Sequence, residues 1–260
     1  MKRNMLLLRC LLLVGLCFSG CGLSSTPSTM VDFTPNGKTI VAACIDGFVR
    51  AEAVSEGGLA CEIDTKAGRV VSLAVIDDNR AVAANADKHS FSVYDLKSKK
   101  ATSELRTDGA PVCGLFHLSG DEVLVFDRKG KLERWDVGKK DGALASATLP
   151  AKPTAAAISK DAATVAVSVK KSVRIYDSHT LALLEEIAFA SPLRSVGFVE
   201  GTRLLAVLVG KKLFVYDREK RNKKLVRKHD DNRWMTVSRT LPVVMTSVDK
   251  NLHFHIGDPR

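Results

Sequence analysis

Short apolar runs separated by polar turns follow one another along the chain from about residue 30 onward. The most apolar runs, rich in Val, Ile, Leu and Ala, are residues 39–45, 122–126, 164–169 and 204–209. Runs of this kind are typical of strands covered on both faces. The β-branched residues and the turn signals every few positions disfavour helices. The pattern therefore predicts an all-β protein.

An aromatic residue followed by Asp marks an internal repeat. The pairs are Tyr94-Asp95, Trp135-Asp136, Tyr176-Asp177 and Tyr216-Asp217, so the aspartates lie 41, 41 and 40 residues apart. Each pair ends the third of four predicted strands, which in the second repeat are residues 70–76, 81–86, 91–95 and 101–105. The aromatic side chains are expected to pack between sheets. Sheets that are apolar on both faces must stack against neighbours on either side, and radial packing about an axis achieves this.

The spacing predicts six sheets. They begin near Met30, Arg69, Pro111, Pro153, Pro192 and Asn232. The last has strands at 233–237, 243–248 and 252–256 but lacks its own fourth strand. Residues 23–29 are a poor replacement, because they are polar and include Pro27, which cannot donate a ladder hydrogen bond. Either the last sheet has three strands, or the N-terminal segment pairs with it imperfectly.

A family resemblance begins in the first repeat. Residues 33–38, the strand at 39–42 and Asp46-Gly47 resemble the first turn, second strand and second turn of WD40 repeats, and Trp135-Asp136 matches the signature dipeptide of that family. The resemblance covers residues 30–260 and implies a six-bladed WD40-like β-propeller. The chain lacks the Gly-His dipeptide that precedes each first strand in the family, so it is not expected to share the family's histidine-containing hydrogen-bond network.

The N-terminus has the layout of an export signal. Basic residues at 2, 3 and 9 accompany an apolar run at 10–18, which small residues separate from Cys21. The run is shorter than the about 20 apolar residues that a spanning helix needs. Residues 18–21, Phe-Ser-Gly-Cys, resemble the lipobox of bacterial lipoproteins, although Phe18 stands where the family usually has Leu.

The lipobox resemblance implies three segments: a signal peptide at 1–20, a lipidated Cys21 with a flexible tether at 21–29, and the exported domain at 30–260. Gly22 after Cys21 implies the outer membrane if the host is Gram-negative. The alternative is a plain secretory signal in which Cys21 has no special role. Removing the signal peptide lowers the formal charge from +10 to +7.

Most of that charge lies in residues 218–228. Its basic members are Arg218, Lys220, Arg221, Lys223, Lys224, Arg227 and Lys228, against the single acidic Glu219. The segment is predicted to form the last turn and the outer strand of the fifth sheet, and to contact an anionic surface such as lipid headgroups or an acidic protein. The alternative is a solubilising edge that prevents strand pairing with other molecules. Nucleic acid is not expected as a partner of an exported protein.

Lysines also recur in the turns between second and third strands. They are Lys88, Lys129, Lys131, Lys170, Lys171, Lys211, Lys212 and Lys250. In WD40 topology these turns surround one mouth of the central channel, where such propellers hold partner proteins. A cationic rim would favour acidic peptides or glycans. The alternative is that Lys is simply common in exposed turns.

Candidates for catalysis are few. His253 and His255 alternate on the last predicted strand and, with His229 or Asp258, raise the possibility of a metal site, but exposed histidines are the simpler interpretation. No nucleophile elbow, phosphate-binding loop or paired-Cys zinc spacing occurs. The predicted first strands are almost wholly apolar or small, which argues against the alternative of a hydrolase or lyase-like site in the channel.

The sequence therefore predicts a non-enzymatic, lipid-anchored envelope scaffold without a cofactor, which binds a protein or an anionic polymer through one propeller face. A degenerate remnant of a larger propeller is the third alternative. Cys44, Cys61 and Cys113 are interpreted as buried thiols, with one disulfide as the alternative.

Overall fold

The computed structural model describes residues 28–55, 58–66, 68–85, 87–109, 111–139, 142–199, 203–228, 234–237, 243–248 and 251–256. All regular elements in these residues are β-strands. The chain divides into two compact units, Met1–Arg106 and Thr107–Arg260, which we call the N-terminal and C-terminal units. The signal peptide, Cys21 and most of the predicted tether lie outside the described residues.

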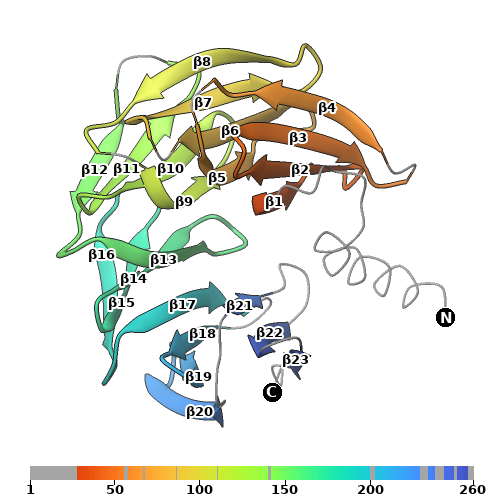
Figure 1. Cartoon of the computed structure of the whole chain (residues 1–260). Coiled ribbons are helices and arrows are strands. Elements are labelled where there is room, and N and C mark those ends of the chain that lie inside the picture. The colour runs from red at the N-terminus through yellow and green to blue at the C-terminus, as the bar shows by residue number, and fades with distance from the viewer. Residues whose placement is uncertain are drawn as a thin grey trace. The chain divides into compact units, whose positions relative to one another are not determined.

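The N-terminal unit contains two antiparallel four-stranded sheets, whose strands follow one another in chain order (Figure 1). Sheet 1 consists of β1 (Ser28–Phe33), β2 (Thr39–Cys44), β3 (Phe48–Ala53) and β4 (Leu59–Asp64). Sheet 2 consists of β5 (Val70–Val75), β6 (Arg80–Asn85), β7 (Ser90–Asp95) and β8 (Lys100–Arg106).

The C-terminal unit contains four further antiparallel sheets. Sheet 3 consists of β9 (Pro111–His117), β10 (Glu122–Asp127), β11 (Lys131–Asp136) and β12 (Ala145–Thr148). Sheet 4 consists of β13 (Pro153–Ile158), β14 (Thr164–Val169), β15 (Ser172–Asp177) and β16 (Leu183–Ala188). Sheet 5 consists of β17 (Leu193–Phe198), β18 (Leu204–Val209), β19 (Lys212–Asp217) and β20 (Asn222–Lys228). Sheet 6 consists of β21 (Trp234–Val237), β22 (Val243–Val248) and β23 (Asn251–Ile256).

The predicted all-β class and the repeated four-stranded plan are confirmed. The apolar runs at 164–169 and 204–209 are β14 and β18, and the other second strands agree within one or two residues. Sheet 6 has three strands in the part of the chain that the structure describes. β1 begins at Ser28, two residues before the expected start of the first repeat.

A register shift recurs near the start of the first strand. It falls between Ser28 and Met30, Val70 and Ser72, Pro153 and Ala155, and Leu193 and Ser195. A bulge bends a strand and increases its local twist. The same irregularity at the same position shows that these sheets are structural repeats as well as sequence repeats.

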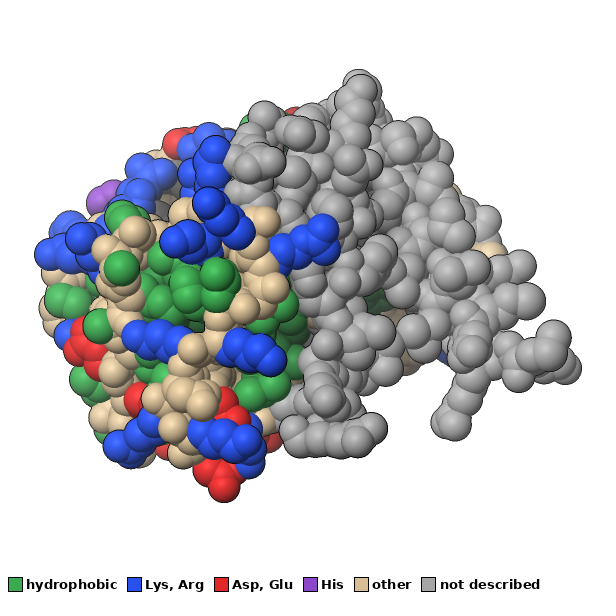
Figure 2. Space-filling model, turned by 90° about the horizontal axis from the view of Figure 1, so that it is seen from below, with side chains coloured by type: hydrophobic (Ala, Val, Ile, Leu, Met, Phe, Trp, Pro, Cys, Tyr) green, Lys and Arg blue, Asp and Glu red, His purple; other side chains and the backbone are tan. Residues whose placement is uncertain are grey.

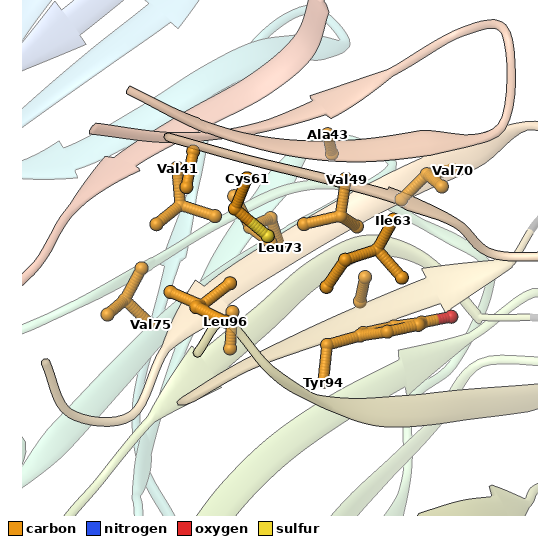
Figure 3. Packing of buried hydrophobic residues seen from close by; sticks show 13 residues of the cluster. Val41, Ala43, Val49, Cys61, Ile63, Val70, Leu73, Val75, Tyr94 and Leu96 are labelled. Atoms are coloured by element: carbon orange, nitrogen blue, oxygen red, sulfur yellow. The ribbon is translucent and has the colours of Figure 1, made fainter. Parts of the chain in front are cut away.

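An apolar layer lies between the two sheets of the N-terminal unit. Val41, Val49 and Ile63 of sheet 1 belong to one buried cluster with Leu73 and Tyr94 of sheet 2. Figure 3 shows these side chains between the strands of the two sheets. Each of them is at most 5% exposed. The facing sides of sheets 1 and 2 are therefore apolar because they bury each other's side chains from water.

The C-terminal unit explains why the second strands are apolar at nearly every position. In β14, Val165 and Val167 belong to the cluster shared with sheet 3, whereas Ala166 belongs to the cluster shared with sheet 5. In β18, Leu205 packs toward sheet 4 and Leu208 toward sheet 6. Both faces of these strands are therefore buried, as the continuous runs predict.

The recurring aspartates accept hydrogen bonds from backbone amides of the turn that follows. The Asp95 carboxylate accepts from the Ser98 amide at 2.6 Å, and Asp177 accepts from the Thr180 amide at 2.7 Å. Asp136 and Asp217 make the same kind of contact. The preceding aromatic residues are buried. Each aromatic-Asp pair thus packs a ring between sheets and closes the hairpin to the fourth strand.

Changing Asp177 to Asn should flatten the dependence of stability on acid pH. Hydrogen bonds from the Thr180 amide and hydroxyl lower the pKa of the Asp177 carboxyl below its ordinary value. A carboxyl with a lowered folded-state pKa stabilises the fold above its unfolded pKa of about 3.9 and loses that contribution as pH falls through the folded value. Denaturant unfolding between pH 6 and pH 2 should show a smaller fall for Asp177→Asn than for wild type. Parallel curves for the two proteins would contradict the role assigned to Asp177.

Candidate anion-binding surface

The second-to-third-strand turns of the C-terminal unit lie beside the chain crossings that lead into the next sheet. The Leu149 amide, after β12, donates to the Gly130 carbonyl at 2.7 Å, and the Leu193 amide, at the start of β17, donates to the Lys170 carbonyl at 3.1 Å. In an antiparallel meander these turns share one end of the sheet with the start of the first strand. The second contact joins this end of sheet 4 to the start of sheet 5, and the short crossing after Leu149 leads from the same end of sheet 3 to the start of β13. We call this the turn end.

The turn end is basic. Its exposed Lys and Arg residues are Arg128, Lys129, Lys152, Lys170, Lys171, Arg194, Lys211, Lys212 and Lys228. The acidic residues described there are Asp108 and Asp127. Asp127 is only 1% exposed, and Asp108 bonds the Lys131 ammonium at 2.7 Å. Among the described residues, basic side chains therefore outnumber acidic ones at this end.

At the opposite end, acidic and basic residues are mixed and form ion pairs. Arg203 bonds Asp217 at 3.0 Å, and Lys139 bonds Asp136 at 3.1 Å. The excess positive charge of sheets 3 to 5 therefore lies mainly at the turn end. A field of one sign attracts an anionic partner and speeds its association.

Tight hairpins place the turn lysines at the tips of sheets 4 and 5. The connection from β14 to β15 is Lys170-Lys171, and the connection from β18 to β19 is Gly210-Lys211. The first residue of each turn has positive φ, 51° for Lys170 and 57° for Gly210. Glycine adopts this conformation freely, whereas Lys170 does so at a cost of roughly 1 kcal/mol.

Lys131 differs from the other predicted rim lysines. Its side chain is 32% exposed, and its ammonium lies 2.7 Å from both Asp108 and Glu133. Hydrogen bonds to these two carboxylates raise the pKa of Lys131. Glu133 is buried and also accepts a bond from the Trp135 indole at 3.3 Å. Lys131 therefore links β11 to the segment before β9, with its charge already paired.

The basic outer strand meets the turn end. Lys228, the last residue of β20, is the register partner of Lys212, the first residue of β19. The turn lysines and the basic segment at 218–228, two separate sites in the sequence, are thus continuous here. Two members of the segment are used in packing between sheets: Arg218 lies 3.5 Å from Glu185, and the Lys223 ammonium lies 4.6 Å from the Phe189 ring centre.

The remaining predicted site residues fall elsewhere. Lys88 is exposed in the turn between β6 and β7 of the N-terminal unit. Lys250, His229 and Asp258 lie outside the described residues, as do the side chains of His253 and His255. Within the described part of the chain, no group of three His, Cys, Asp or Glu residues is arranged to hold a metal ion.

Cys44 and Cys61 are free, buried thiols, and burial raises the pKa of both. They are not joined to each other by a disulfide, which agrees with the interpretation of these two residues as buried thiols. The side chain of Cys113 is outside the described residues.

Arg128, Lys152 and Arg194 were not among the predicted site residues. Lys152 comes just before β13, and Arg194 is the second residue of β17. An alignment of the repeats by their first strands would have shown that basic residues recur near this position. The search for turn lysines missed Arg128, which is in the turn between β10 and β11 but is an arginine. It missed Lys152 and Arg194 because they lie in a crossing between sheets and at the start of a first strand.

A scan of protein families finds none that matches the chain, and a search of curated proteins finds no match. The described residues include no helix long and apolar enough to span a membrane.

Proposed function

We propose that residues 30–260 form a six-bladed WD40-like β-propeller, exported and anchored to a bacterial membrane through lipidated Cys21. In this proposal the protein is a non-enzymatic envelope scaffold. It binds an anionic partner, a protein or an envelope polymer, at the turn end of the C-terminal unit. A Gram-negative host would place it in the outer membrane.

The order of sheet contacts supports the propeller. First strands of successive sheets contact each other within each unit: β1 with β5, β9 with β13, β13 with β17, and β17 with β21. In a propeller the first strand of each blade is the innermost, so neighbouring first strands meet around the axis. The four-stranded meander of each described sheet has the same order as a propeller blade.

The charge asymmetry of the C-terminal unit carries the functional proposal. Basic residues from three sheets converge at the turn end, whereas charges at the other end are mixed and paired. Lys170 adds a second argument, because Gly210 occupies the same turn position in sheet 5 without strain. Glycine at position 170 would give a more stable turn than lysine, so the presence of lysine favours a binding role for its charge.

Replacing Lys170, Lys171, Lys211 and Lys212 with Ser should weaken binding of polyglutamate by about tenfold or more, mainly through slower association. Binding can be followed by fluorescence anisotropy at several salt concentrations. The matched control replaces Lys97, Lys99, Lys100 and Arg106, which are exposed on or beside β8 of the N-terminal unit, with Ser. An equal loss in the control would show attraction by net charge alone and would contradict a site at the turn end.

The single change Lys170→Gly separates the effect of the Lys170 charge on binding from its effect on stability. Relief of the positive φ should make the variant slightly more stable than wild type, while the loss of one charge weakens polyglutamate binding. A variant that is more stable and binds as tightly as wild type would remove Lys170 from the site.

A further inference from the structure

β20 is an outer strand with an unusual surface. It pairs with β19 on one side, and all seven of its residues are exposed. Its sequence, Asn-Lys-Lys-Leu-Val-Arg-Lys, contains no acidic residue. Lysines on an edge strand discourage pairing with other chains. That explanation does not cover Leu225 and Val226, which are 48% and 41% exposed.

The register of β20 places these two apolar side chains next to each other in solvent. Leu225 is the partner of Phe214 and Arg227 is the partner of Leu213, so Val226 has no partner residue on β19. A bulge of this kind turns side chains away from simple alternation. Leu225 and Val226 therefore form a small exposed apolar step, with basic residues before and after it.

The basic residues beside this step are available for an external anion. Lys224, Arg227 and Lys228 form no ion pair or hydrogen bond through their side chains with any described residue. Lys223, by contrast, donates to the Ala188 carbonyl and lies over the Phe189 ring. Three cationic groups thus surround the apolar step, and no described residue serves as their counter-ion.

The outer strands of sheets 1 to 4 have different surfaces. β4, β8 and β16 each contain Glu, and β12 contains no charged residue. The exposed Leu183 and Leu184 of β16 precede two glutamates, which a negatively charged surface would repel. β20 lies at the lower edge of its unit in Figure 1, and the view from below in Figure 2 shows many Lys and Arg side chains around apolar ones.

We infer that β20 is a contact site for an anionic lipid surface. Lys224, Arg227 and Lys228 bind lipid phosphates, while Leu225 and Val226 enter the boundary between headgroups and acyl chains. Basic residues near an anionic leaflet are attracted to it, and apolar side chains add to this attraction by burial. An acidic protein would attract the same charges, but the exposed apolar pair favours a surface with hydrocarbon beneath it.

A lipid on Cys21, the anchor of the proposed function on which this step rests, would strengthen the weak contact between β20 and the bilayer. Only residues 22–27 separate Cys21 from β1. At a maximum of about 3.5 Å per residue, they reach about 20 Å. A lipid at Cys21 would therefore keep the protein close to the bilayer, and a second contact on the same protein is strengthened by this proximity.

The test uses the chain from residue 22 onward, which contains every described strand and no anchor. Sedimentation with vesicles compares phosphatidylcholine alone with phosphatidylcholine that includes phosphatidylglycerol. Wild type should bind the anionic vesicles preferentially. The triple change of Lys224, Arg227 and Lys228 to Ser should weaken that binding by about 100-fold. Leu225→Ser with Val226→Ser should weaken it less, and Lys97, Lys99 and Lys100 changed to Ser serve as the control with unchanged binding.

Three results would overturn the inference: no preference of wild type for anionic vesicles, an equal loss in the control, or a variant with only Lys224 and Arg227 changed to Ser that loses polyglutamate binding but not vesicle binding. The last result would identify an acidic protein as the occupant, because this variant leaves Lys228 of the turn end in place. The turn-end variant distinguishes the two proposals, because it should lose polyglutamate binding and keep vesicle binding. Thermal unfolding of each variant confirms that the sheets remain folded.

Discussion

Changing Arg50 to Ala should lower the free energy of unfolding by about 2–3 kcal/mol. The Arg50 side chain, on β3, is 6% exposed and lies 2.8 Å from Asp46 and 2.6 Å from Glu62. Its guanidinium also lies 4.8 Å from the Phe48 ring centre. Removal of the cation leaves two neighbouring carboxylates without their counter-ion and opens a space beside the turn. Both carboxylates retain some exposure, so water compensates for part of the loss.

Arg174 provides the matched control, because it occupies the same position on β15. It lies 2.8 Å from the single carboxylate of Glu186, and its side chain is 21% exposed. An ion pair of this exposure contributes about 0.2–1 kcal/mol, so Arg174→Ala should cost less than Arg50→Ala. Guanidinium unfolding curves measure both. Equal losses would show that the second carboxylate and the deeper burial of Arg50 add nothing.

The strands were predictable because their pattern follows directly from burial. Val165 and Ala166 are neighbours in β14 that pack toward different sheets, so neither position tolerates a polar residue. The sequence therefore shows neighbouring apolar residues at these positions. The errors lie at strand ends: the third strand of the second repeat is predicted to begin at residue 91, whereas β7 begins at Ser90, which is only 2% exposed.

The side-chain partners were less predictable, because they depend on which strands are adjacent. Arg50 and Glu62 are register partners on β3 and β4, a relation that appears only when the hairpin register is known. Lys131 resembled the other turn lysines in the sequence, but Glu133 and Asp108 pair its charge.

The same reasoning applies to the surface sites. The basic segment at 218–228 is evident from composition, but composition does not show that Lys228 is the partner of Lys212. Nor does it show that the β20 bulge exposes Leu225 and Val226 together. The number of charged residues is known from the sequence. Which of them form internal ion pairs and which remain on the surface is known only from the structure.

Replacing Cys21 with Ser should abolish labelling of the protein by a fatty-acid probe when it is expressed in bacteria. A hydroxyl does not take the place of the thiol that the lipobox resemblance marks for acylation. The wild-type protein should carry the label and sediment with membranes after a salt wash. Acyl chains contribute about 0.8 kcal/mol for each buried methylene, so two or more chains hold a protein on the bilayer through such washing.

Persistent label in Cys21→Ser would contradict the anchor. A second comparison separates the anchor from β20, because electrostatic contact is weakened by salt whereas acyl insertion is not. Unlabelled Cys21→Ser protein should stay with anionic membranes at low salt and leave them at high salt. Combining Cys21→Ser with the β20 triple change should release the protein at both. The proposed membrane attachment would thus rest on two physically different contributions, and these variants remove each one without the other.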